Sequence, residues 1–216
     1  MNNFKYILFD FDGTLADTLP VWMKAFLKAF EEYNIKATKT DIIEKCFGKK
    51  DGAEVMGVNL SDANDFYNRL FQIVEEILAT TMLIDGVDTV LDYLADPFYK
   101  TGIVTSSDSF VVENYLRKRG VYHIFEFVIG GMDVENMKPH PEPIYLAMNK
   151  FQNDIKSEYL IVGDSSSDIY AGKSAGISTC LIHHDNSDIS YRSQNPSDYG
   201  ADYVINSIRD LLRIIG

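Results

Sequence analysis

The chain has 216 residues, of which 46% are hydrophobic and 12% aromatic, a composition that predicts one large domain or a core domain carrying a smaller one. Its formal net charge of -12 argues against nucleic acid and anionic membranes as partners, because a negative field repels both. No stretch approaches the roughly 20 apolar residues that span a bilayer, and the first residues lack a signal-peptide pattern, so we expect a cytoplasmic protein without a membrane segment.

The first strand is predicted at residues 5–9, a short apolar run rich in β-forming residues that leads into Asp10-Phe11-Asp12-Gly13. The segment that follows has long helical periodicity and no convincing strand. Apolar residues fall on one broad face over residues 17–33 and again over residues 61–80. We therefore predict an all-helical cap domain, residues 16–81, inserted into an α/β catalytic core of residues 1–15 and 82–216.

After this helical segment, short apolar strands alternate with helices. Strands are predicted at 101–105, 127–129, 159–162, 179–182 and 202–205, and helices at about 87–94, 109–119, 142–151 and 169–175. Such alternation is typical of βαβ units. The predicted fold class is therefore α/β, with a mainly parallel, Rossmann-like sheet flanked by helices and interrupted by the helical cap.

Polar side chains follow the predicted strands, where open parallel sheets bind their ligands. They are Asp10 and Asp12 after the first strand, Thr105 and Ser106 at the end of the second, Lys138 before a helix, and Asp164 and Asp168 after a later strand. Side chains two apart on an extended segment face the same way, so both carboxylates of the first pair can enter one site.

These residue types suit phosphoryl transfer. A carboxylate is a competent nucleophile toward phosphorus once the negative charge of the phosphate is neutralised. Mg²⁺ takes oxygen ligands, which Asp10 and Asp164 can supply. The two hydroxyl side chains can donate hydrogen bonds to phosphate oxygens, and the lysine adds a positive charge. Asp12 lies where it can protonate the leaving oxygen and then deprotonate a water molecule.

The residues from Asp10 to Thr18 resemble the first motif of the haloacid dehalogenase-like hydrolases. Thr105-Ser106 is similar to the second motif of that family, Lys138-Pro139 to the third, and Gly163-Asp164 with Asp168 to the fourth. The resemblance covers nearly the whole chain, because an all-helical insert between the first two motifs is the small-cap arrangement of the family.

This resemblance implies roles for the residues. Asp10 would be the nucleophile and Asp12 the general acid and base. Mg²⁺ would be held by Asp10, the backbone carbonyl of Asp12 and Asp164, with Asp168 orienting the metal site. Thr105, Ser106 and Lys138 would bind the phosphate.

The implied activity is Mg²⁺-dependent hydrolysis of a small phosphate monoester through an aspartyl-phosphate intermediate, as in phosphoglycolate and sugar phosphatases of the small-cap branch. The same motifs permit an alternative, a phosphosugar mutase similar to β-phosphoglucomutase. A receiver-type signalling domain also combines an acidic pocket with Thr or Ser and Lys on a parallel sheet. The Asp-x-Asp pair and the long helical insert argue against that third function.

The expected partner is a small phosphorylated metabolite, and its leaving group would be recognised by the cap. The segment from Cys46 to Gly52 joins two helical patterns and has glycines that allow a loop to approach a ligand. Lys49 and Lys50 in this loop are candidates for contact with an anionic or polar part of the leaving group. Two solvated lysines are the alternative interpretation. The sequence carries no signal for oligomeric state.

Overall fold

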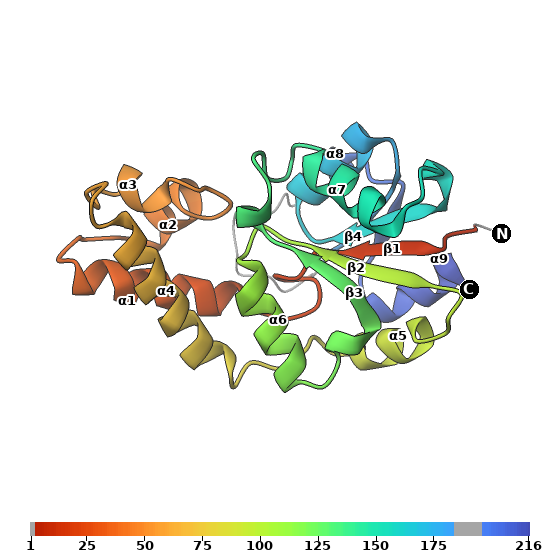
Figure 1. Cartoon of the computed structure of the whole chain (residues 1–216), viewed down its shortest axis with the longest axis horizontal. Helices are drawn as coiled ribbons and strands as arrows, with labels where there is room; N and C mark the ends of the chain where they lie inside the picture. The colour runs from red at the N-terminus through yellow and green to blue at the C-terminus, as the bar shows by residue number, and fades with distance from the viewer. Residues whose placement is uncertain (1–2, 184–195) are drawn as a thin grey trace. The chain divides into compact units, whose positions relative to one another are not determined.

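The computed structural model describes residues 3–183 and 196–216, and its central feature is a parallel sheet (Figure 1). Among these residues the sheet has six strands in the order β3-β2-β1-β4-β5-β6. The strands are β1 Tyr6–Phe9, β2 Lys100–Val104, β3 Phe125–Ile129, β4 Tyr159–Gly163, β5 Ser178–Ile182 and β6 Tyr203–Ile205. All five neighbouring pairs run parallel, which confirms the predicted α/β fold class.

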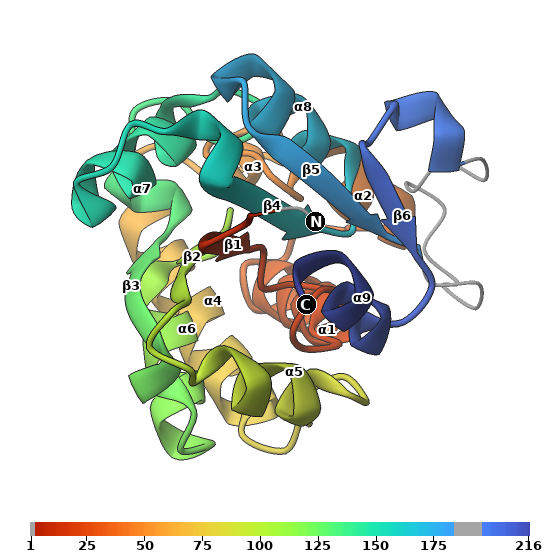
Figure 2. The same cartoon turned by 90° about the vertical axis from the view of Figure 1, so that its right-hand side faces the viewer.

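Helices cover both faces of this sheet. They are α5 Val87–Leu94, α6 Ser109–Lys118, α7 Glu142–Phe151, α8 Ser166–Ala175 and the short α9 Leu212–Ile215. Figure 2 shows α7 and α8 on one face, with α5, α6 and α9 on the other. Burial on both faces explains why the central strands read as continuous apolar runs rather than alternating patterns.

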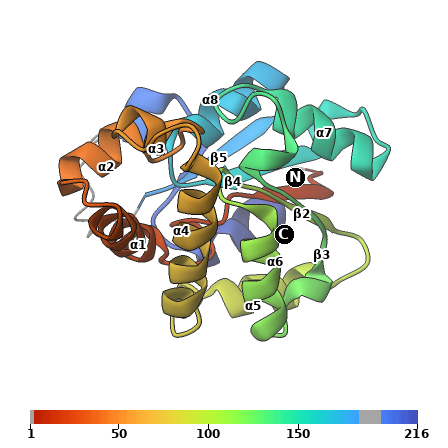
Figure 3. The ribbon, with the colours of Figure 1, turned by 60° about the vertical axis from the view of Figure 1, so that its left-hand side comes forward.

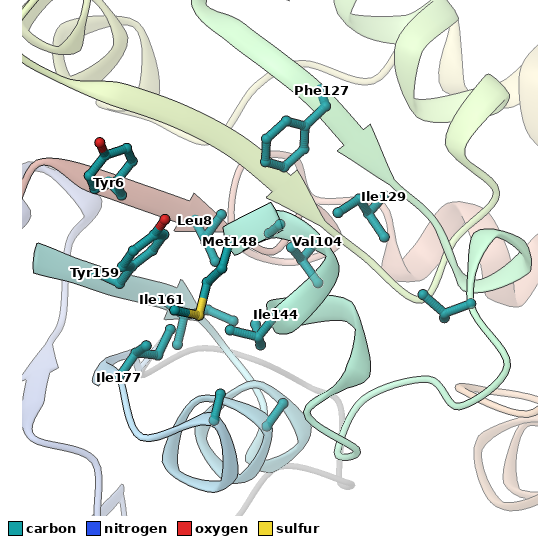
Figure 4. Close-up of a cluster of buried hydrophobic side chains, with 14 residues drawn as sticks. Tyr6, Leu8, Val104, Phe127, Ile129, Ile144, Met148, Tyr159, Ile161 and Ile177 are labelled. Carbon is teal, nitrogen blue, oxygen red and sulfur yellow. The ribbon is translucent and has the colours of Figure 1, made fainter. Parts of the chain in front are cut away.

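A hydrophobic cluster fills the space between the sheet and the pair α7 and α8 (Figure 4). Leu8 and Ile161 contribute from neighbouring strands, and Ile144 contributes from α7. The rings of Tyr6 and Tyr159 stack with centroids 4.7 Å apart. This packing fixes β1 against β4, and so fixes the relative positions of the residues that follow those two strands.

Residues Asp17–Met82 form a second compact unit, and residues 3–16, 83–183 and 196–216 belong to the first. The described elements of the second unit are all helices: α1 Leu19–Glu32, α2 Lys39–Lys45, α3 Gly52–Val55 and α4 Ala63–Leu78 (Figure 3). α1 packs against α4, where the rings of Phe30 and Phe66 lie 4.8 Å apart. α2 begins with a reciprocal capping box between Thr38 and Asp41. That this helical unit acts as a cap stays a prediction.

The observed elements differ from the expected ones mainly at short segments. α2, α3 and α9 were not expected as helices, and β3 begins at Phe125 rather than at residue 127. No helix in the described part of the chain combines the length and apolar character needed to cross a membrane.

Candidate functional site

The predicted site residues follow strands that lie side by side. β1 lies between β2 and β4, and all three strands run parallel. Asp10 directly follows β1, Thr105 follows β2 and Asp164 follows β4. Because the carboxyl ends of parallel neighbours meet at one edge of a sheet, the three side chains come together there. All three are buried.

Lys138 is the cationic centre of this cluster. Its Nζ lies 2.7 Å from Asp10 Oδ1, 2.6 Å from Asp168 Oδ1 and 2.6 Å from the carbonyl oxygen of Val104. A lysine ammonium has three donors, and these three acceptors can take all of them. The Lys138 side chain is only 2% exposed. The structure therefore brings the predicted third and fourth motifs directly against the predicted nucleophile.

Asp168 is held in place by the start of α8. Its Oδ2 accepts hydrogen bonds from the backbone N–H of Ser165 at 3.1 Å and from the Ser165 hydroxyl at 2.6 Å. This is a capping box, in which the N-cap and the third helical residue satisfy each other. A Cβ atom at Gly163 would overlap the Asp168 carboxyl group, so the close approach of strand and helix requires glycine.

Burial and charge act in opposite directions on the two central groups. Burial raises the pKa of Asp10 to about 7, while the Lys138 ammonium beside it has a lowering effect. Burial alone would lower the pKa of Lys138, but the carboxylates of Asp10 and Asp168 raise it above its ordinary value. Lys138 is therefore a permanent positive charge, and Asp10 depends on neighbouring cations to stay ionised.

Asp12 faces a different set of partners. Its Oδ2 accepts hydrogen bonds from Thr105 Oγ1 at 3.2 Å and from Ser107 Oγ at 2.5 Å. Gly13, with a φ of +79°, turns the chain after Asp12 and donates its N–H to the carbonyl oxygen of Ala16 at 2.8 Å. Lys138 thus contacts Asp10, whereas both of these hydroxyl donors to Asp12 come from the segment that follows β2.

Sequence reasoning missed two residues that contact these carboxylates. One is Ser107, which contacts Asp12. Its neighbour Ser106, the predicted phosphate-binding residue, is half-buried. The other is the fully buried Thr14, whose Oγ1 lies 3.5 Å from Asp10 Oδ2. Both lie within or next to the motifs, but no spacing rule separates a hydroxyl that contacts a carboxylate from one that contacts a ligand.

A group of three buried carboxylates has the donor set of a divalent-cation site. Asp10, Asp164 and Asp168 each offer an oxygen atom, and these atoms all lie within 4.8 Å of one another. Such all-oxygen surroundings suit a hard ion such as Mg²⁺. Both oxygens of Asp168 already accept hydrogen bonds, from Lys138 and from Ser165. Asp10 accepts from the same lysine and, at the longer distance of 3.5 Å, from Thr14. The three carboxylates together supply the oxygen atoms that a hard divalent ion requires, so these residues fit the expected metal.

Lys49 and Lys50 belong to the helical unit, where both are exposed on the loop between α2 and α3. Tyr67 in α4 holds this loop. Its hydroxyl donates to the carbonyl oxygen of Lys50 at 3.0 Å and accepts the backbone N–H of Ala53 at 3.1 Å. The lysines therefore extend from a loop whose backbone is tied to a long helix.

The chain is similar to known proteins over most of its length. Residues 7–182 match the family described as haloacid dehalogenase-like hydrolase. The chain is similar to the pyrophosphatase PpaX of Halalkalibacterium halodurans, with 33% identity over 97% of this chain and 96% of that protein. It is also similar to the phosphoglycolate phosphatase of Haemophilus influenzae, with 28% identity over 98% of both chains.

Among solved structures, one described as a predicted phosphoglycolate phosphatase from Haemophilus somnus superposes with a TM-score of 0.84. The two chains are 25% identical, and the similarity covers 100% of each. The match therefore includes both compact units of the chain.

Proposed function

Because the chain belongs to the haloacid dehalogenase-like hydrolase family, we propose that it is a Mg²⁺-dependent phosphatase that hydrolyses a small phosphate monoester through an aspartyl phosphate on Asp10. Its similarity to a pyrophosphatase and to a phosphoglycolate phosphatase supports phosphatase activity in general. The observation that carries the proposal is the contact between Lys138 Nζ and Asp10 Oδ1 at 2.7 Å, both buried beside Asp164.

In the first step, Asp10 attacks phosphorus and the bond to the leaving oxygen breaks. Lys138 supports ionisation of the nucleophile, because its fixed positive charge stabilises a carboxylate that burial would otherwise protonate. Asp12 gives its proton to the leaving oxygen. Thr105 and Ser106 donate hydrogen bonds to oxygens of the transferred group. The products of this step are a free alcohol and a phosphate ester of the Asp10 carboxyl group.

In the second step, Asp12 takes a proton from water, and the resulting hydroxide attacks the phosphorus of the aspartyl phosphate. Phosphate leaves and the Asp10 carboxylate is restored, so Asp12 ends the cycle protonated, as it began it. The Lys138 ammonium, 2.7 Å from Asp10 Oδ1, favours the ionised nucleophile that the first step requires.

The residues that would hold Mg²⁺ are Asp10, Asp164 and the backbone carbonyl of Asp12, with Asp168 orienting the site. When bound, the ion supplies the charge that lets a carboxylate approach a phosphate dianion. Lys138 cannot do this alone, because Asp10 and Asp168 already balance its charge.

The test is turnover by Asp10→Asn with Mg²⁺ and p-nitrophenyl phosphate. An amide keeps the size of the side chain but is not a competent nucleophile, so we expect a loss of at least about 10³-fold in kcat. Asp154→Asn is the matched control, because Asp154 is exposed in the same unit. Retained turnover by Asp10→Asn would overturn the proposal.

For the substrate, we propose a small phosphorylated metabolite whose polar leaving group is recognised by Lys49 or Lys50. Their exposure on a loop anchored by Tyr67 supports this assignment. A panel of phosphate esters should include pyrophosphate, phosphoglycolate and hexose phosphates. Lys49→Ala with Lys50→Ala should raise KM for the preferred ester, whereas the exposed Lys39→Ala in α2 should not. Unchanged kinetic constants across the panel would remove both lysines from the site.

The same panel separates hydrolase from phosphosugar mutase. Free phosphate released from a hexose 1-phosphate supports the hydrolase, and an isomerised sugar phosphate supports the mutase.

A further inference from the structure

We propose that Ser107 is the positioning residue that holds Asp12 in place for proton transfer, an inference that rests on the proposed function. The distances carry it. Ser107 Oγ lies 2.5 Å from Asp12 Oδ2, whereas Thr105 Oγ1 lies 3.2 Å from the same oxygen. The shorter hydrogen bond therefore comes from Ser107, a residue outside the four sequence motifs.

The two hydroxyl groups are not equivalent partners of Asp12. The backbone N–H of Ser107 donates to Thr105 Oγ1 at 3.0 Å, which leaves the Thr105 hydroxyl proton directed at Asp12. A hydroxyl group has a single proton to donate. When the Thr105 hydroxyl donates its hydrogen bond to a phosphate oxygen, its hydrogen bond to Asp12 is lost. Ser107 then remains as the hydroxyl donor to Asp12 Oδ2.

This division gives each hydroxyl one task during turnover. Thr105 changes partner when phosphate arrives, and Ser107 keeps the orientation of the Asp12 carboxyl group throughout. Proton transfer requires the acid to stay within hydrogen-bonding reach of the leaving oxygen. Without the hydrogen bond from Ser107, the Asp12 carboxyl group would spend less time in the productive orientation.

The backbone of Ser107 is itself fixed from the neighbouring strand end. Its carbonyl oxygen accepts the N–H of Gly131 at 2.9 Å. A Cβ atom at Gly130 would lie 2.5 Å from the N atom of Ser109 and 2.7 Å from the carbonyl oxygen of Ser107, so these segments are in tight contact. Asp108 then caps α6 by accepting the N–H of Val111 at 3.1 Å. Ser107 is thus presented from a rigid turn.

The test compares two aryl phosphates that differ in how much the leaving group needs a proton. Phenolate is a poor leaving group and depends on Asp12, whereas p-nitrophenolate departs readily without protonation. We expect Ser107→Ala to lower kcat/KM by about 10-fold or more for phenyl phosphate, a part of the 10²–10⁴ that general acid catalysis supplies. For p-nitrophenyl phosphate the loss should be several-fold smaller.

Two further variants serve as controls for Ser107→Ala. Ser107→Thr keeps the hydroxyl group and should recover most of the activity on phenyl phosphate. Ser106→Ala removes a proposed phosphate contact, so its loss should be equal for the two esters. Thermal unfolding of each variant checks that the fold is retained.

The outcomes separate this inference from the proposed function. A larger loss on phenyl phosphate for Ser107→Ala, with recovery in Ser107→Thr, supports the inference. Equal losses on the two esters for Ser107→Ala, or no recovery on phenyl phosphate in Ser107→Thr, would overturn the inference. Either result would leave the phosphatase proposal intact. A wild-type protein that releases phosphate from no ester would overturn both.

Discussion

Lys138 and Asp10 form a buried ion pair, with Nζ 2.7 Å from Oδ1, although 128 residues separate them in the sequence. A second carboxylate, Asp168, lies 2.6 Å from the same nitrogen. The lysine is therefore shared between the start of the sheet and the first turn of α8. Its positive charge offsets the burial of both carboxylates and lowers the pKa of Asp10 relative to burial alone.

Replacing Lys138 with methionine should destabilise the protein strongly. The change leaves Asp10 and Asp168 buried without their cation, and breaking a buried pair in this way costs about 3–5 kcal/mol. Urea unfolding at pH 7.5 measures the free energy of unfolding. The exposed Lys118→Met in α6 is the control and should change stability by less than about 0.5 kcal/mol. Equal stability of the two variants would contradict the structural role of Lys138.

Gly163→Ala should disturb the site through Asp168. The new Cβ atom would overlap the Asp168 carboxyl group, which must then leave Lys138 or Ser165. Overpacking of this kind costs about 1–3 kcal/mol, and we expect turnover to fall with it. Thermal unfolding and p-nitrophenyl phosphate hydrolysis check both effects. Wild-type values in both assays would contradict this prediction, because they would show that α8 can move away from β4 to admit the methyl group at little cost.

Removal of divalent cations should abolish phosphatase activity. Chelation by EDTA leaves Asp10 and Asp164 without the charge that neutralises a phosphate, and added Mg²⁺ should restore turnover. Asp164→Asn should need a higher Mg²⁺ concentration for half-maximal activity, because an amide oxygen is a weaker ligand than a carboxylate. Asp154→Asn should match the wild type. Full activity in EDTA would contradict the metal assignment.

Tyr67→Phe should loosen the loop that carries Lys49 and Lys50. The hydroxyl group links the carbonyl oxygen of Lys50 to the N–H of Ala53, and its loss should cost about 0.5–1.5 kcal/mol for each hydrogen bond. Hydrogen exchange at the Ala53 amide reports the change locally. Tyr170→Phe, which removes a hydroxyl from a 44% exposed side chain in α8, is the control. Unchanged protection at Ala53 would show that the loop is held by other contacts.

Both cysteines should be unreactive in the native protein at pH 8. Burial raises the pKa of Cys46 to about 12, and burial does the same for Cys180. Because the thiolate is the reactive form, a raised pKa keeps each thiol protonated and inert until the pH is far higher. Titration with a chromogenic disulfide should detect no fast thiol before unfolding and both thiols in denaturant. Val55→Cys, at a 57% exposed position, should add one fast thiol.

The sheet and the closeness of Asp10 to Asp164 could be predicted because both follow from short-range patterns and one packing rule. The expected helices at 87–94 and 142–151 agree with α5 and α7 to the residue. Apolar runs marked the strands, and the carboxyl ends of parallel strands must meet. This rule is enough to place Asp10 near Asp164, and the motif order added Lys138.

Other features depend on geometry that no periodic pattern records. α3 has four residues, too few for a helical repeat to be recognised. β3 extends back to Phe125, where its register with β2 shifts between Thr101 and Ile103. Ser107 reaches Asp12 only because of the path that the chain takes after β2. Such a path is set by tertiary contacts, among them the tight approach of Gly130.

The two ends of the helical unit leave the α/β unit at neighbouring residues. Ala16 and Leu83 pair in an isolated antiparallel bridge, and Ile84 donates its N–H to Leu15 at 2.9 Å. Bridged residues of this kind lie roughly 5 Å apart. A short turn can close that gap, because loop-closure entropy depends only weakly on loop length. Every strand pairing of the sheet lies outside residues 17–82. A chain that joins residue 16 to residue 83 through a two-residue turn therefore retains every segment that the sheet requires.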